Sequence, residues 1–121
     1  MTTTPTTTKT HTIDATGKRL GILATEAAKV LLGKVSADYA RHIMADVTVE
    51  ITHASKLDMS EKKKAELYQT FSGYPGGRKT ETFAHLSTRR GYGEALRRTI
   101  AGMLPNNKHK KQLLKQLVIS E

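Results

Sequence analysis

The sequence is poor in several residue types, and each shortage removes a class of protein. It contains no cysteine, which excludes disulfides, thiolate metal sites and cysteine nucleophiles. No apolar run approaches the roughly 20 residues that a membrane-spanning helix needs. The opening segment, MTTTPTTTKTH, has no apolar centre and so lacks the pattern of a secretory signal peptide. We therefore expect a cytoplasmic protein.

Positive charge is what the sequence has in excess. Its 121 residues include 20 Lys+Arg and 11 Asp+Glu, a net charge of +9. Residues 1–60 hold seven cations and six anions, whereas residues 61–121 hold thirteen and five. Clustered cations indicate a polyanionic partner, because each Lys or Arg placed against a phosphate releases condensed counterions. Solubility alone explains such clustering less well, since it is served by interspersed charge.

The hydrophobic pattern predicts a single domain over residues 11–121, preceded by a disordered Thr-rich tail at residues 1–10. Strands alternating with helices indicate an α/β fold around a mainly parallel sheet. The expected elements are strands at 11–15, 46–52, 67–71 and 117–119, helices at 18–32, 61–66 and 92–103, a basic helical turn after 108, and a further short segment at 82–86. Gly33 and Pro105 are expected to end the two longer helices.

The glycine-rich stretch FSGYPGGRKT, residues 71–80, resembles a nucleotide-binding loop. The motif GxxxxGK[ST] fails there, because Arg78 stands at the second glycine and Pro75 removes a backbone N–H from the cradle. A dinucleotide fingerprint also fails, since only Gly17 and Gly21 follow the first strand. Two interpretations remain, a cationic contact with a nucleic-acid backbone and a turn between two strands.

Patterns that carry catalysis or bind metals are missing. The five histidines show no HxxxH spacing. No GxSxG elbow occurs, which leaves Ser72 as a turn residue. The sequence therefore predicts no enzyme, no catalytic residue, no cofactor, no metal site, no membrane partner and no small-molecule substrate.

The cations form clusters that suit a nucleic-acid backbone. Arg97 and Arg98 lie off the apolar stripe of their helix, and the tail lysines recur on one helix face. Motifs for base recognition by aromatic sheets or zinc fingers are missing, so we expect recognition of shape and phosphate. The candidate nucleic-acid-binding residues are Lys18, Lys34, Lys62, Lys63, Lys64, Tyr74, Gly76, Gly77, Arg78, Lys79, Arg89, Arg90, Arg97, Arg98, Asn106, Lys108, Lys110 and Lys111.

Tyr74 is the one aromatic residue well placed to lie on a base or a sugar. Packing over Pro75 explains it equally well. In the binding interpretation, Gly76 and Gly77 let the backbone approach a nucleic acid closely, while Arg78 and Lys79 supply charge. The sequence leaves open whether the Tyr74–Pro75 peptide bond is cis.

The order of these motifs resembles family thirteen of the large-subunit ribosomal proteins. The resemblance is carried by IDATGKRLGILATEAAKVLLGK, DVTVEITHA, KAELYQTFSGYPGGRK and AGMLPNNK, in the family's order from Ile13 to Lys108. It implies a three-layer α/β/α sandwich with a mainly parallel four-stranded sheet. It also implies binding to large-subunit rRNA beside neighbouring ribosomal proteins, in support of subunit assembly and translation.

Several residues depart from the family pattern. Ile22 and His53 stand where the family usually has Arg and Asn, and Ala45-Asp46 replaces Gly-Asp. Thr70-Phe71 occupies the place of an Arg-His pair, and Lys108–Lys111 replaces Leu-Gly-Arg. A C-terminal extension with His-Pro residues is absent. We expect a divergent, C-terminally shortened member whose tail lysines take over part of the backbone neutralisation.

Two other functions stay open at the level of sequence. One is a small nucleotide-using enzyme with a degenerate loop, which magnesium-dependent nucleotide binding lost in Lys79→Ala would support. The other is a regulator that bends DNA or binds messenger RNA. Competition between rRNA fragments and duplex DNA separates that regulator from a ribosomal protein.

Overall fold

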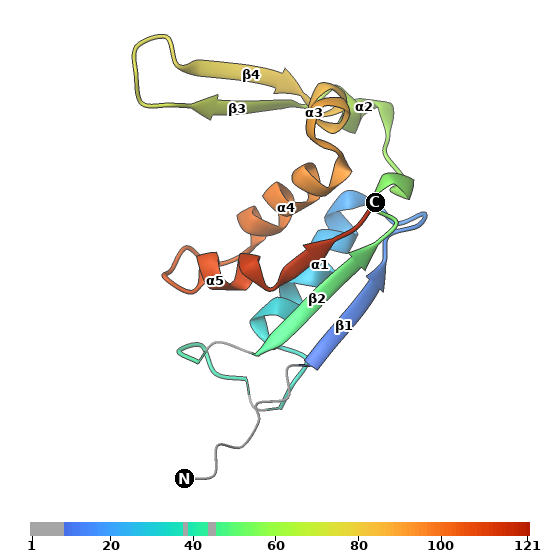
Figure 1. Cartoon of the computed structure of the whole chain (residues 1–121), viewed down its shortest axis with the longest axis vertical. Coiled ribbons are helices and arrows are strands. Elements are labelled where there is room, and N and C mark those ends of the chain that lie inside the picture. Colours follow the sequence, from blue (N-terminus) through green and yellow to red (C-terminus); the bar gives the residue numbers. More distant parts are fainter. Residues whose placement is uncertain (1–8, 38, 44–45) are drawn as a thin grey trace.

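A computed structural model describes residues 9–37, 39–43 and 46–121 (Figure 1). A three-stranded parallel sheet and a separate antiparallel hairpin contain the strands of this part of the chain. The elements are β1 (Lys9–Asp14), α1 (Leu20–Leu32), β2 (Val47–Thr52), the 3-10 turn η1 (Ala54–Lys56), α2 (Glu61–Lys64), β3 (Leu67–Phe71), β4 (Arg78–Thr82), α3 (Phe83–Arg90), α4 (Tyr92–Met103), α5 (Lys110–Lys115) and β5 (Leu117–Ile119).

The parallel sheet has the strand order β1-β2-β5, and alternate residues of its strands enter the core. In β2, Val47, Val49 and Ile51 are buried while the residues between them are half-exposed. Ile13 of β1 lies beside Ile51, and Leu117 of β5 lies beside Val49. Parallel neighbours require crossover connections, which α1 provides between β1 and β2.

Helix α1 covers the inner face of the sheet, as its periodicity predicted. Its buried residues include Leu20, Leu23 and Leu31. The helix ends at Gly33, which has a φ of 81° and donates its N–H to carbonyls of the last turn. A left-handed residue at this place satisfies carbonyls that the helix leaves unpaired, so the expected role of Gly33 is confirmed. Helix α4 packs beside α1 and ends at Met103, two residues before Pro105.

The prediction of a four-stranded parallel sheet is wrong, because the described residues form three parallel strands. Helices cover only one face of these three strands. The open face carries mainly polar residues, including Thr12 and Glu50, and Val118 on it is 48% exposed. Figure 1 shows this face with no helix in front of it. The strand expected as the fourth member, β3, pairs with β4 instead. A short turn closes an antiparallel pair directly, whereas a parallel pair needs a crossover.

Other boundaries shift by a few residues. Strand β1 begins at Lys9, two residues before the expected start, and residues 1–8 of the expected disordered tail lie outside the described residues. The short segment at 82–86 is the beginning of helix α3. Thr82 caps this helix, since its hydroxyl oxygen accepts a hydrogen bond from the His85 N–H at 3.2 Å. Among the helices described, none has the length and apolar character needed to cross a membrane.

Candidate nucleic-acid interface

The hairpin arm, residues 67–82, projects from the rest of the molecule (Figure 1) and turns at the sequence YPGG. The Gly77 N–H donates to the Tyr74 carbonyl at 3.0 Å, and Gly76 has a φ of 72°. With Pro75 before Gly76, this geometry is that of a type II β-turn. A Cβ at Gly77 would lie 2.1 Å from the Ser72 hydroxyl oxygen. The geometry of the turn therefore explains why glycine occupies both positions, without reference to a ligand.

The side chain of Tyr74 at this turn is 75% exposed. The Tyr74–Pro75 peptide bond is trans, which answers the question that the sequence left open. An exposed ring at the tip of a projecting arm is accessible to a partner. Contact with a base stays a prediction for this residue.

Arg78 and Lys79 belong to strand β4 rather than to a loop. Arg78 pairs with Phe71 of β3, and Lys79 pairs with Thr70. Successive side chains of a strand point to opposite faces, so the two cations lie on opposite faces of the arm. They do not form the single cationic pair that the sequence suggested. A nucleotide loop leads from a strand into a helix N-terminus, so strand β4 also rules out that interpretation.

Lys79 lines a concave region of about 600 Å³ between the arm and helices α3 and α4, which we call the basic cleft. Four candidate residues come together there from three elements, namely Lys79, Arg89, Arg90 and Arg98. The remaining lining residues are Thr70, Thr80, Glu81 and His85. Because cations far apart in the sequence face one hollow, the cleft is the strongest candidate for an anion-binding surface.

Glu81 is the one carboxylate among the described residues that line the basic cleft. Arg89 donates two hydrogen bonds to it, from Nη2 at 2.7 Å and from Nε at 3.2 Å, and His85 Nδ1 lies 2.9 Å from Glu81 Oε2. The bonds from Arg89, followed by that from His85, lower the pKa of Glu81 to about 2. The same contact raises the pKa of Arg89. Glu81 therefore stays ionised and holds Arg89 against the cleft wall.

The other cations of the basic cleft form fewer ion pairs than Arg89. Arg98 pairs with Glu94 at 3.4 Å, one helical turn away. Neither Lys79 nor Arg90 has an ion-pair partner within the described ranges. Both side chains of this pair are half-buried but reach solvent, and ion pairs in contact with water contribute little stability, so exchanging Glu94 for a phosphate costs the protein little. The cleft therefore retains a net positive charge that is open to an external anion.

Arg97 is the neighbour of Arg98 but has a different setting. Its guanidinium donates to the Leu114 carbonyl at 3.2 Å and to the Leu117 carbonyl at 3.4 Å. These two bonds join helix α4 to the end of α5 and the start of β5. The structure therefore separates Arg97, which holds parts of the fold together, from the cations of the basic cleft.

The lysines of helix α2 lie outside the basic cleft. Lys62 is exposed, Lys63 pairs with Glu66, and Lys64 pairs with Glu61 at 3.5 Å. The Ser60 side chain caps the helix by accepting from the Lys63 N–H at 3.3 Å, as the sequence suggested.

The remaining candidates are spread over the surface. Lys18 pairs with Glu26 at 3.1 Å. Asn106 accepts a hydrogen bond from Lys110 Nζ at 2.9 Å. The exposed residues Lys34, Lys108 and Lys111 have no ion-pair partner in the part of the chain that is described. Four of the candidate residues thus meet in the basic cleft, and the others lie at separate places on the surface.

Reasoning from the sequence missed Glu81 and His85. Their spacing with Arg89, four residues at each step, matches one helix face and was the available signal. In the structure Glu81 precedes the helix and reaches the other two from strand β4. Across the described residues, no three His, Asp or Glu side chains are grouped so that they could hold a metal ion.

Comparisons with known proteins agree with the resemblance drawn from the motifs. The model of the family described as Ribosomal protein L13 matches residues 8–121. Proteins named "Large ribosomal subunit protein uL13" are similar to the chain: that of Trichormus variabilis is 42% identical over 110 residues, covering 90% of this chain and 72% of the relative. The relative from Symbiobacterium thermophilum is 37% identical over 112 residues, covering 92% and 78%. The match spans nearly all of the described residues, the basic cleft and the hairpin arm included, and the chain therefore belongs to the ribosomal protein L13 family.

Proposed function

We propose that this protein is a structural component of the large ribosomal subunit that binds large-subunit rRNA through the basic cleft and catalyses no reaction. The observation that carries the proposal is the convergence of Lys79, Arg90 and Arg98, with Arg89 beside them, on one hollow. Membership in a ribosomal protein family supports the ribosome as the site of action. The relatives are named as proteins of the large ribosomal subunit, which supports that subunit as the location.

The mechanism is neutralisation of phosphate combined with fit to the shape of the RNA. The arm forms one wall of the basic cleft and helices α3 and α4 form the other, so an RNA backbone lying in the cleft meets cations from two sides. Each phosphate that is neutralised releases counterions, which makes the binding strongly dependent on salt. Hydrogen bonds to phosphate fix the position of the protein without reading sequence.

Further contacts extend this surface. Arg78 and Tyr74 reach RNA from the outer face and the tip of the arm, with Gly76 and Gly77 holding the turn in place. Lysines of α2 and of the C-terminal segment, with Lys18, Lys34 and Asn106, bind backbone at the edges. By holding RNA segments together beside neighbouring ribosomal proteins, the protein supports subunit assembly and translation in the cytoplasm.

Sedimentation tests the proposal directly. The tagged full-length protein is expected to migrate with large subunits through a gradient at high salt. The double variant Lys79→Gln/Arg90→Gln is expected to shift toward the free fractions, while Lys29→Gln/Lys56→Gln, which removes the same charge from exposed positions outside the cleft, stays with the subunit. Wild-type protein found only in the free fractions would contradict the proposal.

The alternatives make different predictions. A nucleotide-using enzyme requires saturable, magnesium-dependent binding of ATP or GTP, and the strand conformation of Lys79 and Thr80 argues against a phosphate cradle. A DNA-bending or messenger-RNA regulator requires duplex DNA or messenger RNA to compete with rRNA fragments. We expect rRNA fragments to win against duplex DNA, because a cleft that selects shape distinguishes the RNA helix from the DNA helix.

A further inference from the structure

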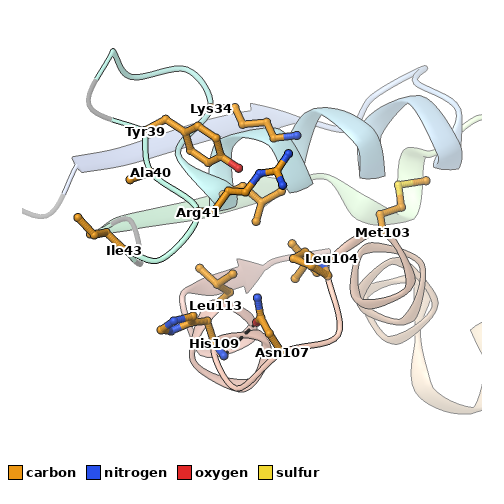
Figure 2. A pocket seen from close by; sticks show the side chains of 12 residues that line it. Lys34, Tyr39, Ala40, Arg41, Ile43, Met103, Leu104, Asn107, His109 and Leu113 are labelled. Atoms are coloured by element: carbon orange, nitrogen blue, oxygen red, sulfur yellow. Dashed lines mark hydrogen bonds between the residues drawn. The ribbon is translucent and has the colours of Figure 1, made fainter.

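A second concave region lies at the other end of the molecule from the hairpin arm, and we call it the loop pocket. Its volume is about 450 Å³. Two chain segments that are distant in sequence enclose it, the connection after α1 and the connection between α4 and α5 (Figure 2). The residues that line it include Lys34, Tyr39, Arg41, Leu104, Asn107 and Leu113.

The loop pocket combines an apolar floor with a cationic rim. Leu104 and Leu113 are 4% and 3% exposed, and they form apolar wall next to Tyr39, which is 40% exposed. Lys34 and Arg41 are exposed at the rim, and Figure 2 shows both on the same side of the pocket as the Tyr39 ring. Of the described residues that line it, none is Asp or Glu.

An amide completes the set of groups. The Asn107 side-chain oxygen accepts a hydrogen bond from the His109 N–H at 3.0 Å, on the side of the pocket that faces Tyr39 in Figure 2. This bond holds the side chain and uses one of the two lone pairs of its oxygen, and the amide N–H groups are donors available to a ligand.

These groups match the parts of a nucleotide. A base needs a flat apolar or aromatic surface and hydrogen-bond partners at its edge, and its phosphate needs cations. The two rim cations repel a basic peptide, and the hollow has the size that small-molecule sites have, about 300–1,000 Å³. Stacking of unpaired bases on aromatic side chains is the usual way in which proteins hold single-stranded RNA.

We propose that the loop pocket binds one unstacked nucleotide of RNA, with its base against Tyr39 and its phosphate at Lys34 and Arg41. This inference rests on the RNA-binding function proposed above and adds a second contact of a different physical kind. The basic cleft binds through charge alone and loses affinity with salt, whereas in the loop pocket the phosphate contact depends on salt and the stacking contact largely does not. The expected contact residues Asn106, Lys108 and Lys111 are close in sequence to residues that line the pocket, and they bind the RNA backbone on either side of the nucleotide.

Substitutions at Tyr39 separate stacking from simple apolar contact. Tyr39→Ala is expected to weaken binding of a large-subunit rRNA fragment by ~10-fold at every salt concentration, with the salt slope unchanged. Tyr39→Phe keeps the ring and is expected to bind like wild type, while Tyr39→Leu keeps only apolar volume and is expected to bind like Tyr39→Ala. Full affinity in Tyr39→Leu would overturn the stacking contact.

Controls separate failure of the pocket from failure of the proposed function. Ile22→Ala alters an exposed apolar side chain outside the pocket, 64% accessible, and is expected to leave RNA affinity unchanged. Circular dichroism confirms that each variant is folded. Lys34→Gln/Arg41→Gln removes one phosphate contact and is expected to reduce the salt slope by roughly 0.7–0.9. If wild type binds RNA with a steep salt slope while all Tyr39 and rim variants bind equally well, the pocket inference fails and the ribosomal function stands.

A direct probe uses ribonucleoside 5′-monophosphates, one at a time, added to the full-length protein. We expect weak binding that shifts the NMR signals of Tyr39 and Asn107 and disappears in Tyr39→Ala, while Lys79→Gln/Arg90→Gln leaves it intact. Shifts confined to the residues of the basic cleft would contradict the inference. Wild type that binds neither mononucleotides nor rRNA would overturn both proposals together.

Discussion

Apolar side chains are buried in the parallel sheet and the helices that cover it, whereas in the hairpin arm they are exposed. In the sheet region Leu23, Val49 and Ile51 are completely buried. In the arm Phe71 and Tyr74 are 70% and 75% exposed. The first region gains its stability from burial, whereas the second displays groups that only a partner can cover.

The arm remains attached because its base joins the core. The Tyr68 ring packs against Phe83 at a centroid distance of 6.0 Å, and the Phe83 N–H donates to the Glu66 carbonyl at 2.9 Å. An isolated two-stranded hairpin is marginally stable in water. The arm therefore depends on the core for its position, while the core does not depend on the outer part of the arm. This difference predicts that stability and RNA binding can be altered separately.

The largest expected effect on stability comes from the sheet region. Leu23→Ala removes a fully buried side chain of α1 and is expected to lower the free energy of unfolding by about 2–5 kcal/mol. Urea denaturation measures this loss. At temperatures where the variant remains folded, its RNA affinity and salt slope should equal those of wild type. A lowered salt slope in the folded variant would break the separation between the two regions.

Two neighbouring arginines give the next test, because they have the same charge and lie on the same helix. Arg97→Ala is expected to cost about 1–3 kcal/mol of unfolding free energy, since the carbonyls of Leu114 and Leu117 lose a charged donor. Arg98→Ala is expected to leave stability nearly unchanged and to reduce the RNA salt slope by about one unit. Equal effects of the two substitutions in both measurements would contradict the roles assigned to them.

The sequence predicted the sheet region well because one-sided burial imposes a period on it. The alternation in β2 and the apolar stripes of α1 and α4 follow directly from having a core on one side. Strand β4 escaped prediction because RKTET contains no apolar residue, and it becomes a strand only by pairing with β3 across the YPGG turn.

The backbone conformation at His53 explains one departure from the family pattern. Its φ is 57°, in the left-handed region, where Asn is favoured and His is tolerated better than most residues. The usual Asn at this position therefore has a conformational explanation that the sequence alone did not provide.

The sequence predicted the cationic residues of the basic cleft but not that they lie together. The sequence identified Lys79, Arg90 and Arg98 as candidates, but their convergence depends on the fold of the arm beside α3 and α4. It also grouped Arg97 with them, because helix periodicity places a side chain on a face without revealing which carbonyls it meets. Pairwise contacts between distant segments are what a single sequence lacks.

A smaller effect is expected at Glu81, which offsets part of the charge of the cleft. Glu81→Gln removes one negative charge and releases Arg89, so RNA affinity at low salt should rise a few-fold. Fluorescence anisotropy with a labelled rRNA fragment measures this change. Weaker binding by Glu81→Gln would show that positioning of Arg89 matters more than net charge.

The pH dependence of Glu81 follows from its lowered pKa of about 2. A carboxyl group whose pKa is lower in the folded state stabilises the protein above its unfolded pKa, and that contribution is lost as the pH falls toward the folded pKa. The ion pair with Arg89 should therefore persist below pH 4 and break only as the pH approaches about 2, while its contribution to stability begins to fall near the unfolded pKa, at about pH 4. NMR titration of the Glu81 carboxyl carbon checks this, and a midpoint near the unfolded value would contradict the hydrogen-bonded geometry.

The salt dependence of rRNA binding tests the central claim most directly. The affinity of the full-length protein for a large-subunit rRNA fragment is measured from low to moderate salt, for wild type and for Lys79→Gln/Arg90→Gln/Arg98→Gln. With each lost phosphate contact contributing roughly 0.7–0.9 to the slope of log affinity against log salt, the triple variant should lose about two to three units. The control variant Lys29→Gln/Lys56→Gln should retain the wild-type slope. An unchanged slope in a folded triple variant would show that the basic cleft is not where this protein binds RNA.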